Sequence, residues 1–145
     1  SRWDPSAVSP VGARGLAQFM PATAGWWGGQ RPDLGAAQPF DPAWALRAQA
    51  GYMKWLLDRV DGRDECHDWA FALSAYNGGL GWVQRDQVKA SVQGLPRDEW
   101  WGSVETVNAG RSKAAWDENR KYPRRILRAL EPVYVAAGWG RGVCR

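Results

Sequence analysis

The stretch that decides the fold is residues 9 to 23, which reads Ser9-Pro10-Val11-Gly12-Ala13-Arg14-Gly15-Leu16-Ala17-Gln18-Phe19-Met20-Pro21-Ala22-Thr23. Closely placed glycines here let the backbone approach a ligand without interference from a Cβ atom. Gln18 offers both a hydrogen-bond donor and an acceptor on a short segment. Taken alone, the stretch predicts either a glycine-flanked helical turn that buries Phe19 and Met20, or one wall of a ligand site.

Two later stretches carry polar and aromatic side chains that can work with the first: Ala75-Tyr76-Asn77-Gly78-Gly79 and Glu118-Asn119-Arg120-Lys121-Tyr122. A helix that ends in a glycine pair can project the Tyr76 phenol and the Asn77 carboxamide into a cleft; the plainer alternative is a core tyrosine followed by an asparagine cap. Glu118 and Tyr122 share a face if their segment is helical. The plainer alternative for Glu118 is a solvated carboxylate beside basic neighbours.

In this order the three stretches resemble the soluble lytic transglycosylase family of peptidoglycan-cleaving enzymes, which is goose-type-lysozyme-like. The resemblance spans residues 1 to about 130. It implies a lysozyme-like fold and an enzyme that cleaves the MurNAc-β-1,4-GlcNAc bond and leaves 1,6-anhydroMurNAc ends. In the family a catalytic glutamate stands directly before a serine that corresponds to Ser1, so this general acid is expected directly before the printed chain.

The resemblance also implies site residues. The equivalent of Tyr76 hydrogen-bonds at the catalytic carboxyl. The substrate-binding residues that the resemblance implies are Ser1, Ser9, Gln18, Met20, Asn77, Glu118 and Tyr122. Asn119 stands where the family often has threonine, and this leaves Glu118 and Tyr122 in register. Asp4 is the carboxylate nearest to the expected acid, but its shorter side chain and different position make it a poor substitute.

The composition is that of one globular domain. The chain has 145 residues, of which 45% are hydrophobic and 23% charged, close to ordinary globular usage. We therefore expect a compact, mainly α, lysozyme-like single domain over residues 1–145, truncated at its N-terminal edge just before Ser1. The net charge of +4 suits an anionic polymer, either a nucleic acid or a cell wall. The 11 tryptophans suit both core packing and sugar stacking.

Apolar spacing predicts several helices behind a loop-rich N-terminal part of about forty residues, which includes Trp26-Trp27-Gly28-Gly29. The surest helix covers residues 42–60 and begins at a cap on Asp41. Its expected apolar face consists of Leu46, Ala50, Met53, Leu57 and Val60.

Further helices are predicted along the rest of the chain. One covers residues 65–77 and ends at Gly78-Gly79, and another covers residues 80–93 and carries Val83, Val88 and Val92. A short helix is predicted around residues 98–107. The last helix is predicted to begin near Pro123, with a kink at Pro132.

Cys66 and Cys144, with His67 as the chain's one histidine, cannot complete a four-ligand zinc site. We therefore expect neither a metal nor another cofactor. Two alternatives stay open for the cysteines: a disulfide that ties the C-terminal tail to the middle of the domain in an oxidising compartment, or two free thiols. No apolar run approaches the roughly 18 residues that a membrane-spanning helix needs.

The resemblance implies peptidoglycan glycan strands as the partner of a monomer that acts in the periplasm or at the extracellular cell wall. A phage endolysin or virion-associated lysin is favoured over a bacterial autolysin. A hydrolytic muramidase on the same fold and a catalytically incomplete peptidoglycan-binding module are alternatives. A nucleic-acid-binding protein is a further alternative, which rests on the basic residues Arg120, Lys121, Arg124, Arg125 and Arg128. No nucleic-acid-binding motif accompanies this run, so no nucleic-acid partner is expected.

Overall fold

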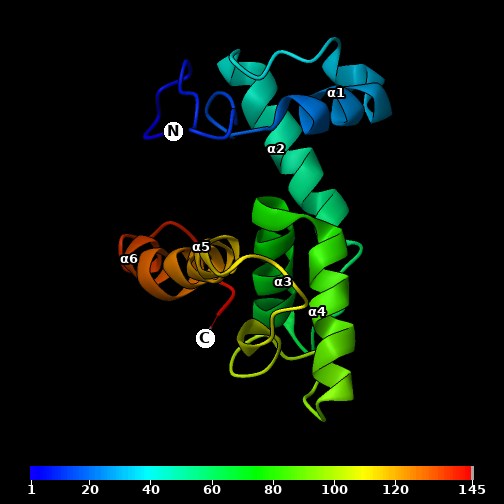
Figure 1. The fold of residues 1–145 in the computed structure, drawn as a ribbon. Coiled ribbons are helices and arrows are strands. Elements are labelled where there is room, and N and C mark those ends of the chain that lie inside the picture. The colour runs from blue at the N-terminus through cyan, green and yellow to red at the C-terminus, as the bar shows by residue number, and fades with distance from the viewer. Residues whose placement is uncertain (145) are drawn as a thin grey trace. The chain divides into compact units, whose positions relative to one another are not determined.

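The structure is a computed structural model that describes residues 1–144, and these residues are mainly helical (Figure 1). The predicted mainly α fold is confirmed. The chain divides into unit 1, Ser1–Trp55, and unit 2, Leu56–Arg145, and each is described by itself. The single domain over residues 1–145 stays a prediction. Within residues 1–144 no helix has both the length and the apolar character to cross a bilayer.

Unit 1 begins with a tightly hydrogen-bonded loop. Arg14 forms isolated antiparallel bridges with Val8 and with Phe19, and the amide of Gly15 donates to the Ala7 carbonyl at 2.9 Å. Gly15 has φ +72°, and a Cβ atom there would lie 1.7 Å from the carbonyl oxygen of Pro39. Both the backbone conformation and the close approach therefore require glycine at position 15.

The first helix of unit 1, α1 (Pro21–Gln30), contains the Trp-Trp-Gly-Gly run. The prediction of a loop-rich first forty residues is wrong for this segment. Pro21 occupies the first helical turn, and Trp27 is buried and donates from Nε1 to the Ala48 carbonyl at 3.1 Å. Tertiary packing thus outweighs the low helix propensity of the glycines. A short 3-10 helix, η1 (Pro32–Leu34), follows.

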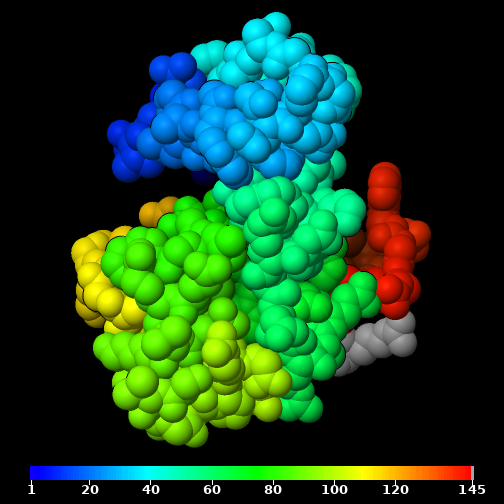
Figure 2. Space-filling model, turned by 90° about the vertical axis from the view of Figure 1, so that its right-hand side faces the viewer, coloured from blue at the N-terminus to red at the C-terminus, as the bar shows by residue number. Residues whose placement is uncertain are grey.

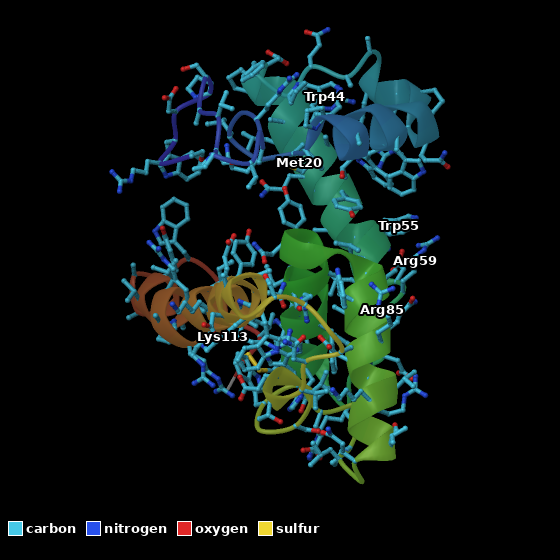
Figure 3. All side chains as sticks on the ribbon, viewed as in Figure 1. Met20, Trp44, Trp55, Arg59, Arg85 and Lys113 are labelled. Atoms are coloured by element: carbon cyan, nitrogen blue, oxygen red, sulfur yellow. A yellow bond between two sulfur atoms is a disulfide. The ribbon has the colours of Figure 1, made fainter. Side chains whose placement is uncertain are left out.

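The helix α2 (Pro42–Leu57) confirms the predicted helix and its cap. The Asp41 carboxylate accepts from the Trp44 amide at 2.8 Å. The predicted apolar face is wrong, because Leu46 is 46% exposed while Trp44, Ala45 and Ala48 are buried. Two apolar stripes compete on this helix, and the side that buries the tryptophan covers more apolar area. Figure 3 marks Trp44 on α2.

The core of unit 1 is built from aromatic rings. Phe19 meets Trp44 edge-to-face with a centroid distance of 5.7 Å. Trp55 stacks on Tyr52 at 5.8 Å and meets the edge of Trp26 at 5.3 Å. Edge-to-face and offset-stacked geometries are those that aromatic quadrupoles prefer.

Unit 2 opens with an antiparallel helix pair, α3 (Glu65–Gly78) and α4 (Leu80–Val92), which lie side by side in Figure 1. Both predicted helices are confirmed. Gly79 has φ +101° and separates them, so α4 begins directly after the turn.

The buried face of α4 differs from the predicted one. Val83 is fully buried, but Val88 is 56% exposed and Val92 is 82% exposed. Asp86, Gln87 and Ala90 are buried on this helix together with Val83. In Figure 2 the yellow-green atoms of the C-terminal half of α4 lie at the surface of unit 2.

The predicted helix at residues 98–107 is wrong. This segment consists of turns and one short 3-10 helix, η2 (Val104–Thr106). The fully buried Trp100 anchors it, and its backbone amide donates to Nδ1 of His67 at 2.7 Å. The segment is therefore held by the burial of Trp100 and by this hydrogen bond rather than by the hydrogen bonds of a helix.

The C-terminal helical segment begins ten residues earlier than predicted. It consists of α5 (Lys113–Pro123), a π-helical segment η3 (Arg124–Leu130) and α6 (Glu131–Ala136). Ser112 caps its start by accepting from the Ala115 amide at 3.3 Å. Pro123 therefore lies at the end of α5, and Pro132 lies in the first turn of α6. Proline has no amide hydrogen, and the wider π-helical turns stand between the two prolines.

The tail after α6 is held by a disulfide between Cys66 and Cys144, which settles the alternative that the sequence leaves open. The Glu131 carboxylate also accepts from the amides of Val143 and Cys144, at 2.6 and 3.0 Å. One covalent bond and two charge-assisted hydrogen bonds thus return the tail to α3 and α6.

Candidate functional site

Unit 1 presents Gln18 in a left-handed conformation, with φ +55°. Its side-chain Nε2 donates to the Gly15 carbonyl at 2.9 Å and to the Ala7 carbonyl at 3.4 Å. The amide donors of this half-buried side chain therefore brace the loop, and Oε1 is the part that suits a ligand donor. A non-glycine residue in this region of φ/ψ space is uncommon, and such residues concentrate at functional sites.

The other predicted residues of unit 1 lie around the same loop. Ser9 is half-buried, and its Oγ accepts from the Ala13 amide at 3.0 Å. Met20 is 41% exposed at the N-cap of α1, whereas Phe19 is buried. The helical-turn alternative, which buries both, is therefore wrong for Met20.

Ser1 and Asp4 form an exposed turn in which the Asp4 amide donates to the Ser1 carbonyl at 2.9 Å. Hydrogen bonds from the hydroxyl and the amide of Ser6 lower the pKa of Asp4. A general acid needs a raised pKa, so this carboxylate has the opposite tuning. The structure thus supports the sequence argument against Asp4 as the acid.

Unit 2 presents Tyr76 and Asn77 in the last turn of α3. Tyr76 is half-buried and Asn77 is exposed. The Oδ1 atom of Asn77 accepts from Nδ2 of Asn119 on α5 at 3.0 Å. The structure therefore brings the end of α3 to the part of α5 that carries Glu118 and Tyr122.

Glu118 and Tyr122 both lie in α5, so the predicted helical register is confirmed. Glu118 is exposed, and Tyr122 is half-buried. Burial raises the pKa of the Tyr122 phenol, which remains a neutral donor and acceptor over the ordinary pH range. Figure 3 marks Lys113 at the start of this helix.

A buried polar network underlies this part of unit 2. Asn119 is 1% exposed, and its Oδ1 accepts from the Ser74 hydroxyl at 2.8 Å and from Nη1 of Arg120 at 2.7 Å. The Arg120 guanidinium also donates to Asp86 at 2.7 Å and to the Val107 carbonyl at 2.6 Å. The side chains next to the candidate site are therefore fixed from inside the unit.

Asp86 is the centre of the network. It is fully buried, it forms ion pairs with Arg120 and Arg111, and it accepts from the Ala109 amide at 2.8 Å. Burial lowers the pKa of both arginines, and the Asp86 carboxylate opposes that effect. Two buried guanidinium groups thus depend on one carboxylate.

This network was not predicted from the sequence. In the sequence, Asn119 is a small departure from the family and Arg120 is one of a run of basic residues. One signal in the sequence could have revealed it. Val83, Asp86 and Ala90 recur at helical spacing, which places a carboxylate on an apolar helix face. A carboxylate buried there needs a buried cation as its partner.

The basic run is less available to a polyanion than its sequence implies. Arg120 is buried, Arg124 pairs with Glu105 at 2.9 Å, and Arg128 lies 4.4 Å above the Trp101 ring. These contacts commit three of the basic side chains to unit 2. Among residues 1–144, no three His, Cys, Asp or Glu side chains form a group that could hold a metal ion.

Comparison with known proteins gives a family match. A family model described as the transglycosylase SLT domain matches residues 1–94. The chain is similar to three proteins named membrane-bound lytic murein transglycosylase F. It is 30% identical to that of Photobacterium profundum over 83% of the chain, 30% to that of Pseudomonas fluorescens over 94%, and 35% to that of Shewanella pealeana over 69%.

The chain spans only 22%, 26% and 20% of the length of these relatives, in the same order. The family match includes Ser1, Ser9, Gln18, Met20, Tyr76 and Asn77. The match to the Pseudomonas fluorescens protein covers 94% of the chain, and any continuous stretch of that length includes Glu118 and Tyr122. Both groups of predicted site residues thus lie in regions shared with relatives.

Proposed function

Because the chain belongs to the transglycosylase SLT domain family, we propose that it forms the catalytic part of a peptidoglycan lytic transglycosylase. The proposed enzyme cleaves the MurNAc-β-1,4-GlcNAc bond and forms 1,6-anhydroMurNAc ends. The observation that carries the proposal is the family match over residues 1–94. The names of the three relatives and the hydrogen-bonded placement of Asn77 beside α5 support it.

The proposed reaction needs one carboxylic acid in two roles. A protonated glutamate donates its proton to the bridging oxygen, and the bond between C1 and that oxygen breaks. The same carboxylate then takes the proton of the sugar's 6-hydroxyl as that oxygen closes on C1, so no water is consumed. Glycoside hydrolysis instead uses two carboxylates. We assign this role to a glutamate directly before Ser1, the position that the resemblance implies.

The residues of the two units take distinct proposed roles. We assign Tyr76 to a hydrogen bond with the catalytic carboxyl, where it would help to hold a raised pKa. In unit 2, the proposed glycan-binding residues are Asn77, Glu118 and Tyr122. In unit 1, they are Ser1, Ser9, Gln18 and the backbone at Met20, with Oε1 of Gln18 as an acceptor for a sugar hydroxyl.

The test is mass spectrometry of soluble fragments released from purified peptidoglycan. Three proteins are compared: the printed chain, the chain preceded by one glutamate, and the chain preceded by one glutamine. The proposal expects the glutamate protein to release fragments one water lighter than reducing-end products and resistant to borohydride. The glutamine protein should release none.

Other outcomes select the alternatives. Reducing ends would indicate a hydrolytic muramidase. Sacculi that bind all three proteins without fragment release would indicate a peptidoglycan-binding module. Replacing Tyr76 with phenylalanine in the glutamate protein should reduce turnover strongly without unfolding it, and unchanged turnover would remove Tyr76 from the site.

We also propose that the protein acts as a monomer in the periplasm or at the extracellular cell wall, as a phage lysin. The Cys66–Cys144 disulfide supports an oxidising compartment, and the net charge of +4 supports adhesion to an anionic wall. Clearing of permeabilised bacteria by externally added protein would fit a lysin. Analytical ultracentrifugation tests the monomer.

A further inference from the structure

Asn119 is the buried side chain that bonds directly to a residue of the candidate site. We infer that Asn119 is the positioning residue of Asn77: it holds the Asn77 amide in one orientation and leaves its N–H groups for an acceptor oxygen of the ligand. The glycan as that ligand rests on the proposed function, whereas the orientation rests only on the geometry of unit 2.

The orientation of the Asn119 amide follows from the chemistry of its partners. Its Oδ1 faces the Arg120 guanidinium, which has donors only, at 2.7 Å. Its Nδ2 donates to the Ser74 carbonyl at 2.9 Å and to Asn77 at 3.0 Å. A carbonyl oxygen only accepts. Exchanging O and N would therefore place a donor against the Arg120 guanidinium and an acceptor against the Ser74 carbonyl.

Every polar atom of Asn119 is thus satisfied. Both Nδ2 hydrogens have acceptors, and the two lone pairs of Oδ1 take the Ser74 hydroxyl and Arg120. Fully satisfied buried networks are rigid, because any rotation leaves a polar atom unpaired in a dry environment. Since Nδ2 can only donate, the atom of Asn77 that faces it must be Oδ1.

Gly78 makes this contact sterically possible. A Cβ atom at position 78 would lie 2.8 Å from Nδ2 of Asn119 and 3.2 Å from Nη1 of Arg111. The last turn of α3 therefore approaches α5 closely only without a side chain at this position. Gly78 in the Tyr-Asn-Gly-Gly stretch thus has a packing role that is distinct from the turn at Gly79.

The inference specifies what Asn77 recognises. Because its Oδ1 is engaged by Asn119, its recognition capacity consists mainly of the two N–H donors of Nδ2. These donors match the acetamido carbonyl of an N-acetylated sugar, which is a neutral acceptor. They do not match a ligand that offers only donors, such as the ammonium of a deacetylated sugar.

The first test uses nuclear magnetic resonance of the printed chain. Asn119→Asp has nearly the same shape and keeps the acceptor for the Ser74 hydroxyl and Arg120, but it replaces the donor that faces Asn77 and the Ser74 carbonyl with an acceptor oxygen. We expect the Asn77 side-chain NH₂ signals to lose their chemical-shift dispersion and move to the positions of a solvated amide. Loss of these signals in Asn77→Asp assigns them.

Two further variants keep the test decisive. Ala90→Gly perturbs the buried face of α4 one helical turn from Asp86 but removes no polar partner of the network, so its Asn77 signals should not change even though its stability falls. Gly78→Ala displaces Nδ2 of Asn119, the atom that donates to Asn77, and should reproduce the effect of Asn119→Asp. This variant decides the question if Asn119→Asp does not fold. Unchanged Asn77 signals in a folded Asn119→Asp or Gly78→Ala protein would overturn the positioning role.

The second test measures affinity for tetra-N-acetylchitotetraose and for its fully deacetylated form. We expect Asn119→Asp to weaken binding of the acetylated sugar by about fivefold to tenfold, the effect of one lost hydrogen bond. If the Asn77 signals of Asn119→Asp lose their dispersion but its affinity for the acetylated sugar equals that of the original protein, the recognition role of Asn77 is overturned. Absence of binding by the original protein would count against the proposed glycan function, while the spectra still decide the role of Asn119.

Discussion

Units 1 and 2 are stabilised by different chemistry. Unit 1 packs aromatic rings against one another, and its Arg31–Asp33 ion pair lies at the surface, with side chains 37% and 50% exposed. Unit 2 contains a fully buried Asp86 between two buried arginines and is crosslinked by a disulfide. The core of unit 1 therefore depends on apolar area, whereas unit 2 adds matched buried charges and a crosslink to an apolar core that includes Phe71, Val83 and Trp100.

This difference has a consequence for function. Aromatic packing tolerates adjustment because ring contacts are numerous and individually weak. A buried charge network has discrete partners, so it holds the polar groups attached to it in one arrangement. Asn77 of unit 2 is attached to such a network through Asn119, while Gln18 of unit 1 depends on loop hydrogen bonds such as its bond to the Gly15 carbonyl.

The largest expected effect is at the buried charge. Asp86→Ala leaves two guanidinium groups without their carboxylate, and we expect a loss of roughly 3 to 5 kcal/mol in the free energy of unfolding. Urea denaturation measures it. The matched control is Asp33→Ala in the exposed pair of unit 1, which should change stability little because solvent screens that pair. Similar losses in both variants would contradict the contrast between the units.

Reduction of the disulfide should have the next largest effect. Opening Cys66–Cys144 should cost about 2 to 4 kcal/mol, because the reduced unfolded chain gains freedom. Hydrogen exchange should show the loss of protection in α3 and α6, with unit 1 less affected. Reductant should not alter a Cys66→Ala/Cys144→Ala protein. Equal loss of protection throughout the chain would mean that the crosslink stabilises both units alike.

A smaller effect is expected in the loop of unit 1. Gly15→Ala combines a positive φ with a clash against the Pro39 carbonyl, and it should destabilise by about 1 to 3 kcal/mol. Gly12→Ala is the matched control, since its φ is +90° and no atom lies within 4 Å of the added Cβ. In thermal denaturation, Gly15→Ala should have a lower melting temperature than Gly12→Ala. The reverse ranking would show that the contact at Pro39 relaxes.

The smallest effect concerns alkaline pH. Burial raises the pKa of Tyr122 above the ordinary value of 10.0, so the folded protein holds this proton more tightly than the unfolded chain. This stabilisation is complete below about pH 10 and is lost as the pH rises through the folded pKa. Tyr122→Phe should make the alkaline loss of stability shallower. Absorbance at 295 nm should show that the variant lacks one late-titrating phenol; loss of a phenol with an ordinary pKa would contradict the assignment.

Predictions from sequence succeeded where the signal is local. The cap at Asp41 and the helix pair around Gly79 follow from side-chain hydrogen bonding and glycine stops within a few residues. They failed where the structure depends on contacts between residues that are distant in the sequence. α1 forms despite its glycines because Trp27 reaches Ala48, and the buried face of α2 follows its tryptophan rather than its leucine.

The candidate site shows the same division. Gln18, Tyr76 and Asn77 were predicted from short motifs, because a motif is read from the identity and spacing of neighbouring residues alone. The amide orientation of Asn77 was not, because it depends on Asn119, 42 residues away. A sequence records which polar groups are present, but not which of them will be buried together.

The sequence by itself determined the family, the helical class and the candidate residues, since these depend on residue identity and local periodicity. The tertiary structure alone decided that Arg120 is a buried partner of Asp86 rather than part of a solvated basic surface, and that Cys66 and Cys144 are joined. The physical reason is that the energy of a charge or a thiol depends on its surroundings, and only the folded chain supplies those surroundings.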